Sequence, residues 1–235
     1  MTFNIYVRSY NRYDRIETGR TLEYCTYVVR ASQAEAYRKL GIESVWGIED
    51  SLVNSGEKVL NYLIDHAPED VIAVLDDDIE LFRYRHETFE NIDDPVIVTR
   101  EIERLAQLIT DLNIGYASTA GHTNLMYYDE PFKFVGVNGG LKIFNRKCVK
   151  GRFDGTYRFL SDDDFELQEL LHNRIILLSE YFIHAGKINT NAGGNNDNKS
   201  IQEFESNHAR LKEKWGKYYK LPVNSASGGF KVKRR

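Results

Sequence analysis

One stretch of the sequence decides the fold. It reads VIAVLDDD and runs from Val71 to Asp78. Its first five residues are all apolar, and a short uninterrupted run of this kind suits a central strand that is buried on both faces of a sheet. Three aspartates follow directly. Because ligands of open α/β sheets bind beyond the carboxyl ends of the strands, we expect a binding site here.

The three aspartates predict a site for a divalent cation. If the strand geometry persists to its end, Asp76 and Asp78 point to one side of the sheet and Asp77 to the other. Adjacent carboxylates repel one another, and a cation offsets this cost. Carboxylate oxygens favour Mg²⁺ or Mn²⁺, and either ion can also hold a substrate diphosphate. The plainer interpretation is a solvated acidic turn, but a turn does not need three acids behind a buried strand.

Short apolar strands alternate with helices on both sides of this stretch, which predicts a single three-layer α/β domain. Capping boxes are expected at Ser32 with Glu35 and at Ser200 with Glu203, and Gly41 is expected to close the first helix. The predicted strands are 3–9, 26–30, 43–48, 71–75, 115–119, a strand-like part of 132–145, and 175–184. The predicted helices are a short one from 32 to 41, 56–67, 98–112, 161–171 and 200–215.

Composition narrows the class of protein. The chain has 235 residues, 42% of them hydrophobic and 28% charged, which is ordinary for one globular domain. The net charge is −4, so a nucleic-acid partner would have to meet a local basic patch. Cys25 and Cys148 form neither a metal motif nor a disulfide framework. No apolar run resembles a signal peptide or a membrane span, so we expect a cytosolic protein.

A second acidic cluster opens a predicted helix. It reads SDDDFEL and runs from Ser161 to Leu167. A carboxylate at such a position could act as general base on an acceptor hydroxyl. The plainer interpretation is that Ser161 caps the helix and that acids in the first turn are stabilised by the helix dipole. That interpretation explains one or two acids better than three. A catalytic role and a role in stabilising the start of the helix therefore both remain open.

Several motifs together resemble the nucleotide-sugar-dependent glycosyltransferases of the GT-A type. They are SYNR at 9–12, Ser55-Gly56 leading through Lys58 to Asn61, the strand running into DDD at 76–78, and DDFEL at 163–167. The last looks like the acceptor-site motif Glu-Asp with Asp in place of Glu. More narrowly, RSYNR, TYVVRASQAEAY and VIAVLDDDIELF look like the TET-associated glycosyltransferases, which are encoded largely by bacteriophages and linked to glycosylation of hydroxymethylated pyrimidines in DNA.

The resemblance implies the fold and its division. The fold would be a GT-A-like (Rossmann-like) mixed sheet flanked by helices, in one domain over residues 1–220. A donor half would cover about 1–90 and an acceptor half about 91–220. Residues 221–235 would form a basic C-terminal tail.

The resemblance also implies which residues bind the donor. The nucleoside would be held by the loop after the first strand and by the end of the second strand, through Ser9, Tyr10, Arg12 and Arg30. The nucleotide would also face Lys58 and Asn61. Lys58 stands where related enzymes more often carry arginine, which would replace a two-pronged phosphate contact by a single point charge.

Metal ligands and catalytic groups follow from the same resemblance. The metal, Mn²⁺ or Mg²⁺, would be bound by Asp78, with Asp76 and His184 as further ligands, because imidazole suits Mn²⁺. Asp76 or Asp77 would also contact the ribose. Gly139 and Gly140 would let the backbone approach the donor sugar, since glycine has no side chain. The catalytic base would be Asp164, with Asp163 beside it, and the Gly/Asn-rich loop 186–199 could close over the donor.

The expected function is transfer of a sugar, with inversion, from a nucleotide-sugar such as a UDP-sugar to a hydroxymethylated pyrimidine in phage DNA in the host cytoplasm. Without a base near the acceptor, a retaining mechanism is expected instead. Base flipping would draw on nearby aromatic and basic residues, namely Tyr127, Tyr128, Phe132, Phe134 and the run 231–235. Each of these has a plainer interpretation, core packing for the aromatic residues and a solubilising tail for the basic run.

Three other functions remain open. The chain could be a GT-A enzyme acting on a glycan, a lipid-linked sugar or a protein. It could be a nucleotidyltransferase, although the loop at 18–21, TGRT, is a poor match to a triphosphate-binding loop. It could also be a non-catalytic module that binds a nucleotide-sugar or DNA, which intact acids in both clusters disfavour.

Overall fold

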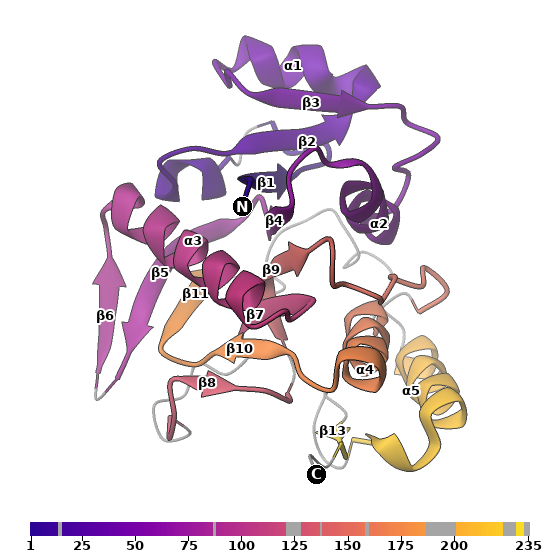
Figure 1. Cartoon of the computed structure of the whole chain (residues 1–235). Coiled ribbons are helices and arrows are strands. Elements are labelled where there is room, and N and C mark those ends of the chain that lie inside the picture. The colour runs from indigo at the N-terminus through magenta and orange to yellow at the C-terminus, as the bar shows by residue number, and fades with distance from the viewer. Residues whose placement is uncertain are drawn as a thin grey trace.

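The protein folds around a mixed central sheet with helices on both faces, as the computed structural model in Figure 1 shows. The structure describes residues 1–13, 16–86, 88–120, 128–136, 138–157, 160–186, 201–222 and 229–232. Two apolar cores lie on opposite faces of the sheet, one under helix α3 and one under helices α2 and α4. The expected α/β class with a mixed sheet and flanking helices is confirmed.

The central strand is the one predicted from the run of apolar residues. Strand β4 (Val71–Asp76) lies between β1 and β9, and each of its five apolar side chains is buried. Within the described residues the main sheet has eight strands. Their order is β3 (Val45–Ile48), β2 (Thr26–Arg30), β1 (Phe3–Arg8), β4, β9 (Asn138–Asn145), β7 (Tyr116–Ala120), β10 (Leu177–Ser179) and β8 (Phe132–Lys133).

The direction of the strands sets the position of the site. Strands β3, β2, β1 and β4 pair in parallel, so their carboxyl ends meet at one edge of the sheet. Strand β9 runs antiparallel between β4 and β7 and brings residues from the second half of the chain to the same region. A buried, mostly parallel sheet of this kind explains why β4 is apolar without alternation.

A smaller sheet continues from the acidic turn. Asp77 and Asp78 form a turn that links β4 to β5 (Ile79–Arg85), and β5 pairs with β6 (Phe89–Ile92) and β11 (Phe182–Gly186). The predicted single strand over 175–184 is wrong, because β10 and β11 belong to different sheets. The chain turns between them, where the amide of Glu180 donates to the carbonyl of Pro131 and its buried carboxylate pairs with Arg85.

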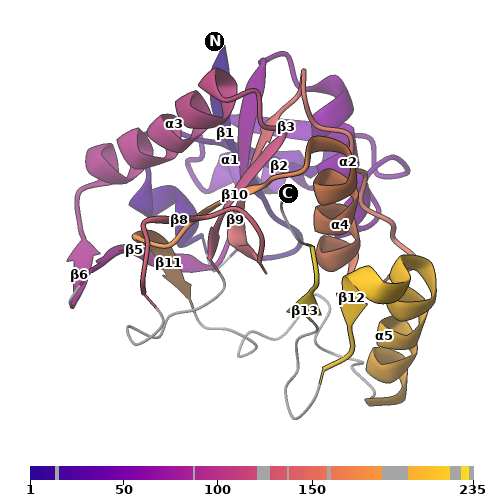
Figure 2. The same cartoon turned by 60° about the horizontal axis from the view of Figure 1, so that its bottom comes forward.

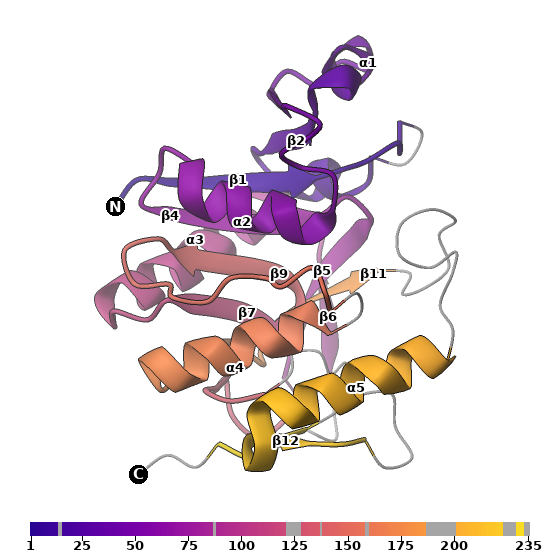
Figure 3. The same ribbon diagram turned by 90° about the vertical axis from the view of Figure 1, so that its right-hand side faces the viewer.

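Helices α2 and α3 each pack through one apolar face, whereas α4 is buried against both the sheet and α5. Leu60, Leu63 and Ile64 bury the inner face of the second helix, as their spacing predicts. Figure 3 shows α2, α4 and α5 on the same side of the sheet, while α3 covers the other. The helices are α1 (Ala34–Lys39), α2 (Gly56–His66), α3 (Pro95–Asp111), α4 (Ser161–Asn173) and α5 (Ile201–Trp215).

Two predicted helix caps are wrong. The Ser32 hydroxyl donates to Asp50 instead of capping α1, since a 3-10 turn (Ala31–Gln33) precedes that helix. Ser161 is the first residue of α4 and its hydroxyl donates to Glu57, so it is not the residue before the helix that could cap it. Gly41 does end α1, with a φ of 83° that glycine tolerates. Ser200 lies outside the described residues.

The C-terminal part packs on α4. Leu160, Leu167, Leu211 and Tyr219 form a third apolar core between α4 and α5. Figure 2 shows β12 (Tyr219–Lys220) and β13 (Gly229–Phe230) beside α5, and the two strands pair antiparallel. The described part of the predicted tail is therefore folded onto the domain. No helix in the described ranges is both long and apolar enough to cross a bilayer.

Candidate functional site

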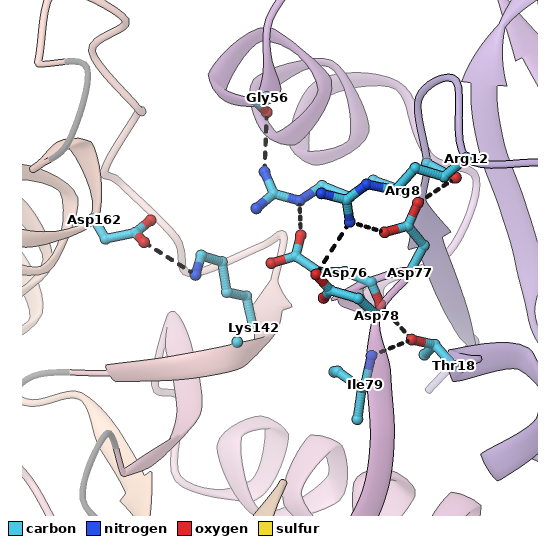
Figure 4. Close-up of polar contacts among 12 residues, drawn as sticks. Arg8, Arg12, Thr18, Gly56, Asp76, Asp77, Asp78, Ile79, Lys142 and Asp162 are labelled. Carbon is cyan, nitrogen blue, oxygen red and sulfur yellow. Dashed lines mark hydrogen bonds and ion pairs between the residues drawn. The ribbon is translucent and has the colours of Figure 1, made fainter. Parts of the chain in front are cut away.

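A pocket of about 620 Å³ opens at the carboxyl ends of β1, β2 and β4. Asp76, Asp77 and Asp78 line it, together with residues at the beginning of α2 and of α4. The close-up in Figure 4 shows the acidic turn facing Arg8 and Arg12 from the N-terminal strand and loop. The binding site expected beyond the end of β4 therefore coincides with a real cavity.

Asp76 is paired with Arg8 inside this pocket. The Arg8 Nε donates to the carboxylate of Asp76, and Arg8 Nη1 donates to the carbonyl of Gly56 at 3.4 Å. Burial raises the pKa of Asp76, but the attraction of Arg8 and its hydrogen bond outweigh burial, so the pKa is lowered overall. Asp76 is therefore ionised, and its side chain is 39% exposed to the pocket.

Asp77 and Asp78 share one arginine. Arg12 Nη1 lies 2.6 Å from Asp77 Oδ1 and 3.1 Å from Asp78 Oδ2. Asp77 is buried and also accepts from the Ser9 hydroxyl, and burial raises its pKa despite these two partners. Strand β4 ends at Asp76, so the alternation expected for the three side chains stops there. The carboxylates of Asp77 and Asp78 both contact the guanidinium of Arg12.

Tyr10 and Arg30 form the wall of the pocket at the end of β2. The Arg30 guanidinium carbon lies 4.1 Å from the centre of the Tyr10 ring, which is a cation–π contact. Arg30 Nη2 also donates to the carbonyl of Asn54 at 3.1 Å. Tyr10 is 48% exposed, so it presents a flat aromatic surface beside a positive charge.

The structure places Lys58 and Asn61 on α2, outside the pocket lining. Lys58 is exposed, and its backbone amide donates to the Ser55 hydroxyl that caps the helix. Asn61 is bonded in both directions to the backbone of Phe153, at 2.8 and 2.9 Å. Asn61 therefore fastens α2 to the chain before α4.

Gly139 and Gly140 pack against His184. A Cβ on Gly139 would lie 2.6 Å from His184 Cε1, and one on Gly140 would lie 2.9 Å from His184 Nε2. The Gly140 amide donates to Nε2 at 3.0 Å, and Nδ1 is 2.9 Å from the Thr119 hydroxyl. Burial lowers the pKa of His184 to about 4, so the ring is neutral. The described side chains include no group of three His, Cys, Asp or Glu placed to hold a metal, so Asp76, Asp78 and His184 do not assemble into one.

The second acidic cluster divides between pocket and core. Asp164 is fully buried and is contacted by Trp215 Nε1, Lys214 Nζ and Gln168 Nε2 at 2.8–2.9 Å. Asp163 is also buried, and its carboxylate accepts a hydrogen bond from the Tyr219 hydroxyl. Asp162 alone of the three lines the pocket, with a side chain that is 43% exposed.

Three functional candidates were missed from the sequence. Arg8 and Asp162 line the pocket, and Lys142 of β9 lies 3.4 Å from Asp162. Arg8 could have been found, because it is the last residue but one of a predicted strand that ends at the edge where ligands bind. Asp162 was visible in the cluster, but only tertiary packing distinguishes it from its two neighbours.

Some of the residues proposed for base flipping pack against the core, and the others lie outside the described residues. Tyr128, Phe132 and Phe134 are partly buried and pack against the core under α3, as the plainer interpretation holds. Tyr127, residues 187–199 of the predicted closing loop and the tail residues 233–235 lie outside the described residues.

Comparison with solved structures identifies the architecture. Glucosyl-3-phosphoglycerate synthase from Mycobacterium tuberculosis, in complex with Mg²⁺ and uridine-diphosphate, is similar over 95% of this chain and 81% of its own, with 12% identity and a TM-score of 0.52. The same enzyme with Mn²⁺ and UDP-glucose covers 97% and 86%, with 10% identity and a TM-score of 0.51.

A looser likeness is to S. aureus TarS, at 14% identity and a TM-score of 0.48, over 77% of this chain and 60% of that structure, and it adds nothing to the assignment. No family model and no curated protein sequence matches the chain. The sheet order, the acidic turn after β4 and the likeness across nearly the whole chain together give this protein the GT-A fold.

Proposed function

We propose that this protein is a glycosyltransferase that moves a sugar from a nucleotide-sugar to an acceptor hydroxyl. One observation carries the proposal. The acidic turn of Asp76 to Asp78, the Tyr10–Arg30 pair and Asp162 line a single pocket at the carboxyl edge of the sheet. An aromatic surface, a cluster of carboxylates and a further carboxylate are the parts that donor binding and displacement require.

The donor half comprises about residues 1–90 in this proposal. The nucleobase stacks on Tyr10, and Arg30 holds the ring and contributes positive charge. The diphosphate extends toward the acidic turn, where Arg8 and Arg12 also lie. A uridine donor is proposed because UDP and UDP-glucose are the ligands of the enzyme of similar fold.

The acidic turn suits Mn²⁺ or Mg²⁺. Asp76 and Asp78 are carboxylates with side chains 39% and 32% exposed. Such ions are commonly held by one or two carboxylates together with substrate phosphates and water, so a third protein ligand is not required. The bound ion would stabilise the negative charge of the departing nucleoside diphosphate. His184 is not needed as a ligand, and its ring is held by Gly140 and Thr119 outside the pocket lining.

Asp162 takes the role of general base in place of Asp164 and Asp163, because it lies at the pocket and they do not. It accepts the proton as the acceptor O–H bond breaks. The acceptor oxygen bonds to the anomeric carbon, and the bond from that carbon to the diphosphate oxygen breaks, with its electron pair leaving on the diphosphate. A single displacement of this kind inverts the anomeric centre.

The proposed acceptor is a hydroxymethylated pyrimidine in DNA, encountered in the cytoplasm of a phage-infected cell. The resemblance of RSYNR, TYVVRASQAEAY and VIAVLDDDIELF to phage enzymes that modify DNA supports this acceptor. Residues from 91 to 220, which include α4 and Asp162, supply the acceptor side of the pocket in this proposal.

A transfer assay tests the proposal. Purified protein with Mn²⁺ is incubated with UDP-sugars and DNA containing 5-hydroxymethylcytosine or 5-hydroxymethyluracil, and the digested nucleosides are analysed by mass spectrometry. A sugar mass added to one nucleoside, and lost with Asp78→Asn, is the expected result. UDP release without a modified nucleoside would move the acceptor to a glycan, lipid or protein. Neither product would overturn the transferase and favour a non-catalytic binding module.

A further inference from the structure

Lys142 is a buried cation on the face of the sheet that carries the pocket. It lies on β9 and is paired with Val74 of β4 and Ser118 of β7. Its side chain is only 4% exposed, and Phe144, two residues along the same strand face, belongs to the apolar core. A lysine in such a position is costly unless its charge is paired, so its partner identifies what it does.

The partner of Lys142 is the pocket aspartate. Lys142 Nζ lies 3.4 Å from Asp162 Oδ2 and 3.5 Å from the carbonyl of Gly139. Figure 4 shows the ammonium group of Lys142 directed at the carboxylate of Asp162. Lys142 does not itself line the pocket, whereas Asp162 does. The ammonium therefore contacts a carboxylate whose side chain is still 43% exposed, which leaves room for a ligand.

The surrounding charges leave Lys142 as the cation bonded to Asp162. The other charged or titratable groups around this pair come from five elements and are Arg8, Glu57, Asp76, Asp163 and His184. Of these only Arg8 carries a positive charge, and its Nε is engaged by Asp76. Neutralising Lys142 would therefore leave Asp162 with only the more distant attraction of Arg8, which is already bonded to Asp76.

We propose that Lys142 is the positioning residue for Asp162, holding its carboxylate ionised and directed at the acceptor hydroxyl. This inference rests on the proposed function for its catalytic meaning, but the contact itself can be measured without any substrate. Lys142 does not touch substrate and acts only through Asp162. An ion pair that merely fastened α4 to the sheet would instead affect stability and leave kcat and its acid limb unchanged.

Three variants separate these roles. Lys142→Met removes the charge and keeps an unbranched apolar side chain, while Lys142→Arg keeps the charge. Lys133→Met is the matched control, because Lys133 pairs with the buried Glu180 near β8, away from the pocket lining. The carboxyl resonance of Asp162, assigned by its disappearance in Asp162→Asn, is followed by NMR as the pH is varied.

We expect Lys142→Met to move the titration midpoint of Asp162 to higher pH by about one unit, because loss of a neighbouring cation favours the protonated carboxyl. The acid limb of kcat/KM should move in the same direction, with kcat lowered ~10-fold or more and the donor KM changed little. Lys142→Arg should restore the midpoint and much of kcat, and Lys133→Met should change neither.

The inference is overturned if the Asp162 midpoint in Lys142→Met equals that of the wild type, whatever happens to activity. It is also overturned if the midpoint moves but kcat and its acid limb stay at wild-type values in an active enzyme. If the midpoint moves and the wild type transfers no sugar to any acceptor, the contact stands and the proposed function fails. The two failures are therefore distinguishable.

Discussion

Trp215 holds Asp164 by a hydrogen bond of 2.8 Å from its indole nitrogen to Oδ1, across the contact between α5 and α4. Lys214 and Gln168 contact the other oxygen, and Asp164 is fully buried. The aspartate that the sequence motif singles out as the base is thus part of the attachment of the C-terminal helix. We therefore expect substitutions of Asp164 and of Asp162 to have different effects on stability and on sugar transfer.

Replacing Asp164 with Ala should destabilise the protein. The change leaves the partly buried Trp215 indole without its acceptor and removes one of the two acceptors of the Gln168 amide, which together cost about 2–3 kcal/mol in the free energy of unfolding. The ion pair with Lys214 adds little, since that lysine is 40% exposed. Urea unfolding followed by fluorescence measures the loss. Asp162→Asn is the matched variant, which keeps an oxygen as a partner for Lys142 and is expected to lose less stability than Asp164→Ala while abolishing transfer. The reverse pattern would restore Asp164 as the base.

Asp163 should make stability fall as pH rises. Burial, followed by repulsion from Asp162, raises its pKa to about 7. The folded state keeps a proton that the unfolded chain loses near pH 4, so the stabilisation is complete below that pH and is lost as pH rises toward 7. Asp163→Asn removes this dependence. The variant should gain free energy of unfolding over the wild type at pH 8, by up to ~4 kcal/mol, and the gain should shrink toward pH 4.

Chemical denaturation at a series of pH values between 4 and 8 checks this. Asp154 provides the contrast, because its hydrogen bonds with Thr156 outweigh burial and lower its pKa. Asp154→Asn should therefore lose stability at neutral pH. A constant difference between Asp163→Asn and the wild type across the range would contradict the expected linkage.

Gly139 should not tolerate a side chain. The Cβ of Gly139→Ala would lie 2.6 Å from both His184 Cε1 and Thr119 Oγ1, so the ring or the strand must shift. Overpacking of this kind costs about 1–3 kcal/mol, which thermal unfolding would detect. Gly155→Ala is the control, because a Cβ at that position would meet no other atom within 4 Å. Equal melting temperatures for the two variants would mean that His184 is not fixed against β9.

Arg12 should compete with a divalent cation for Asp77 and Asp78. In Arg12→Met these carboxylates lose the guanidinium that they share, and repulsion between them increases. Mn²⁺ should then raise the Tm of the variant by about 2–4 °C more than that of the wild type, for each kcal/mol of extra stabilisation. Differential scanning calorimetry with MnCl₂ and with EDTA measures this.

Arg20→Met controls for loss of charge, since Arg20 is 76% exposed and pairs with Glu17, away from the acidic turn's carboxylates. Its response to Mn²⁺ should match that of the wild type. An unchanged response in Arg12→Met would place the cation elsewhere than at the acidic turn.

The sequence by itself determined the α/β class, the central strand and the position of the site. Five consecutive apolar residues favour a strand covered on both faces, and β4 is buried between β1 and β9 as expected. Three aspartates directly behind that strand had to lie at the edge where ligands bind, and the pocket lies there. Local spacing also predicted the inner face of α2.

Only the tertiary structure decided which acid of the second cluster reaches the pocket. Asp162, Asp163 and Asp164 are consecutive on one helix turn, so they point about 100° apart and the sequence cannot tell which direction faces a cavity. The packing of α5 turns Asp164 into the core, and Lys142 of β9 meets Asp162 from a distant part of the chain. Contacts between residues far apart in sequence leave no local pattern, and these contacts define the candidate site.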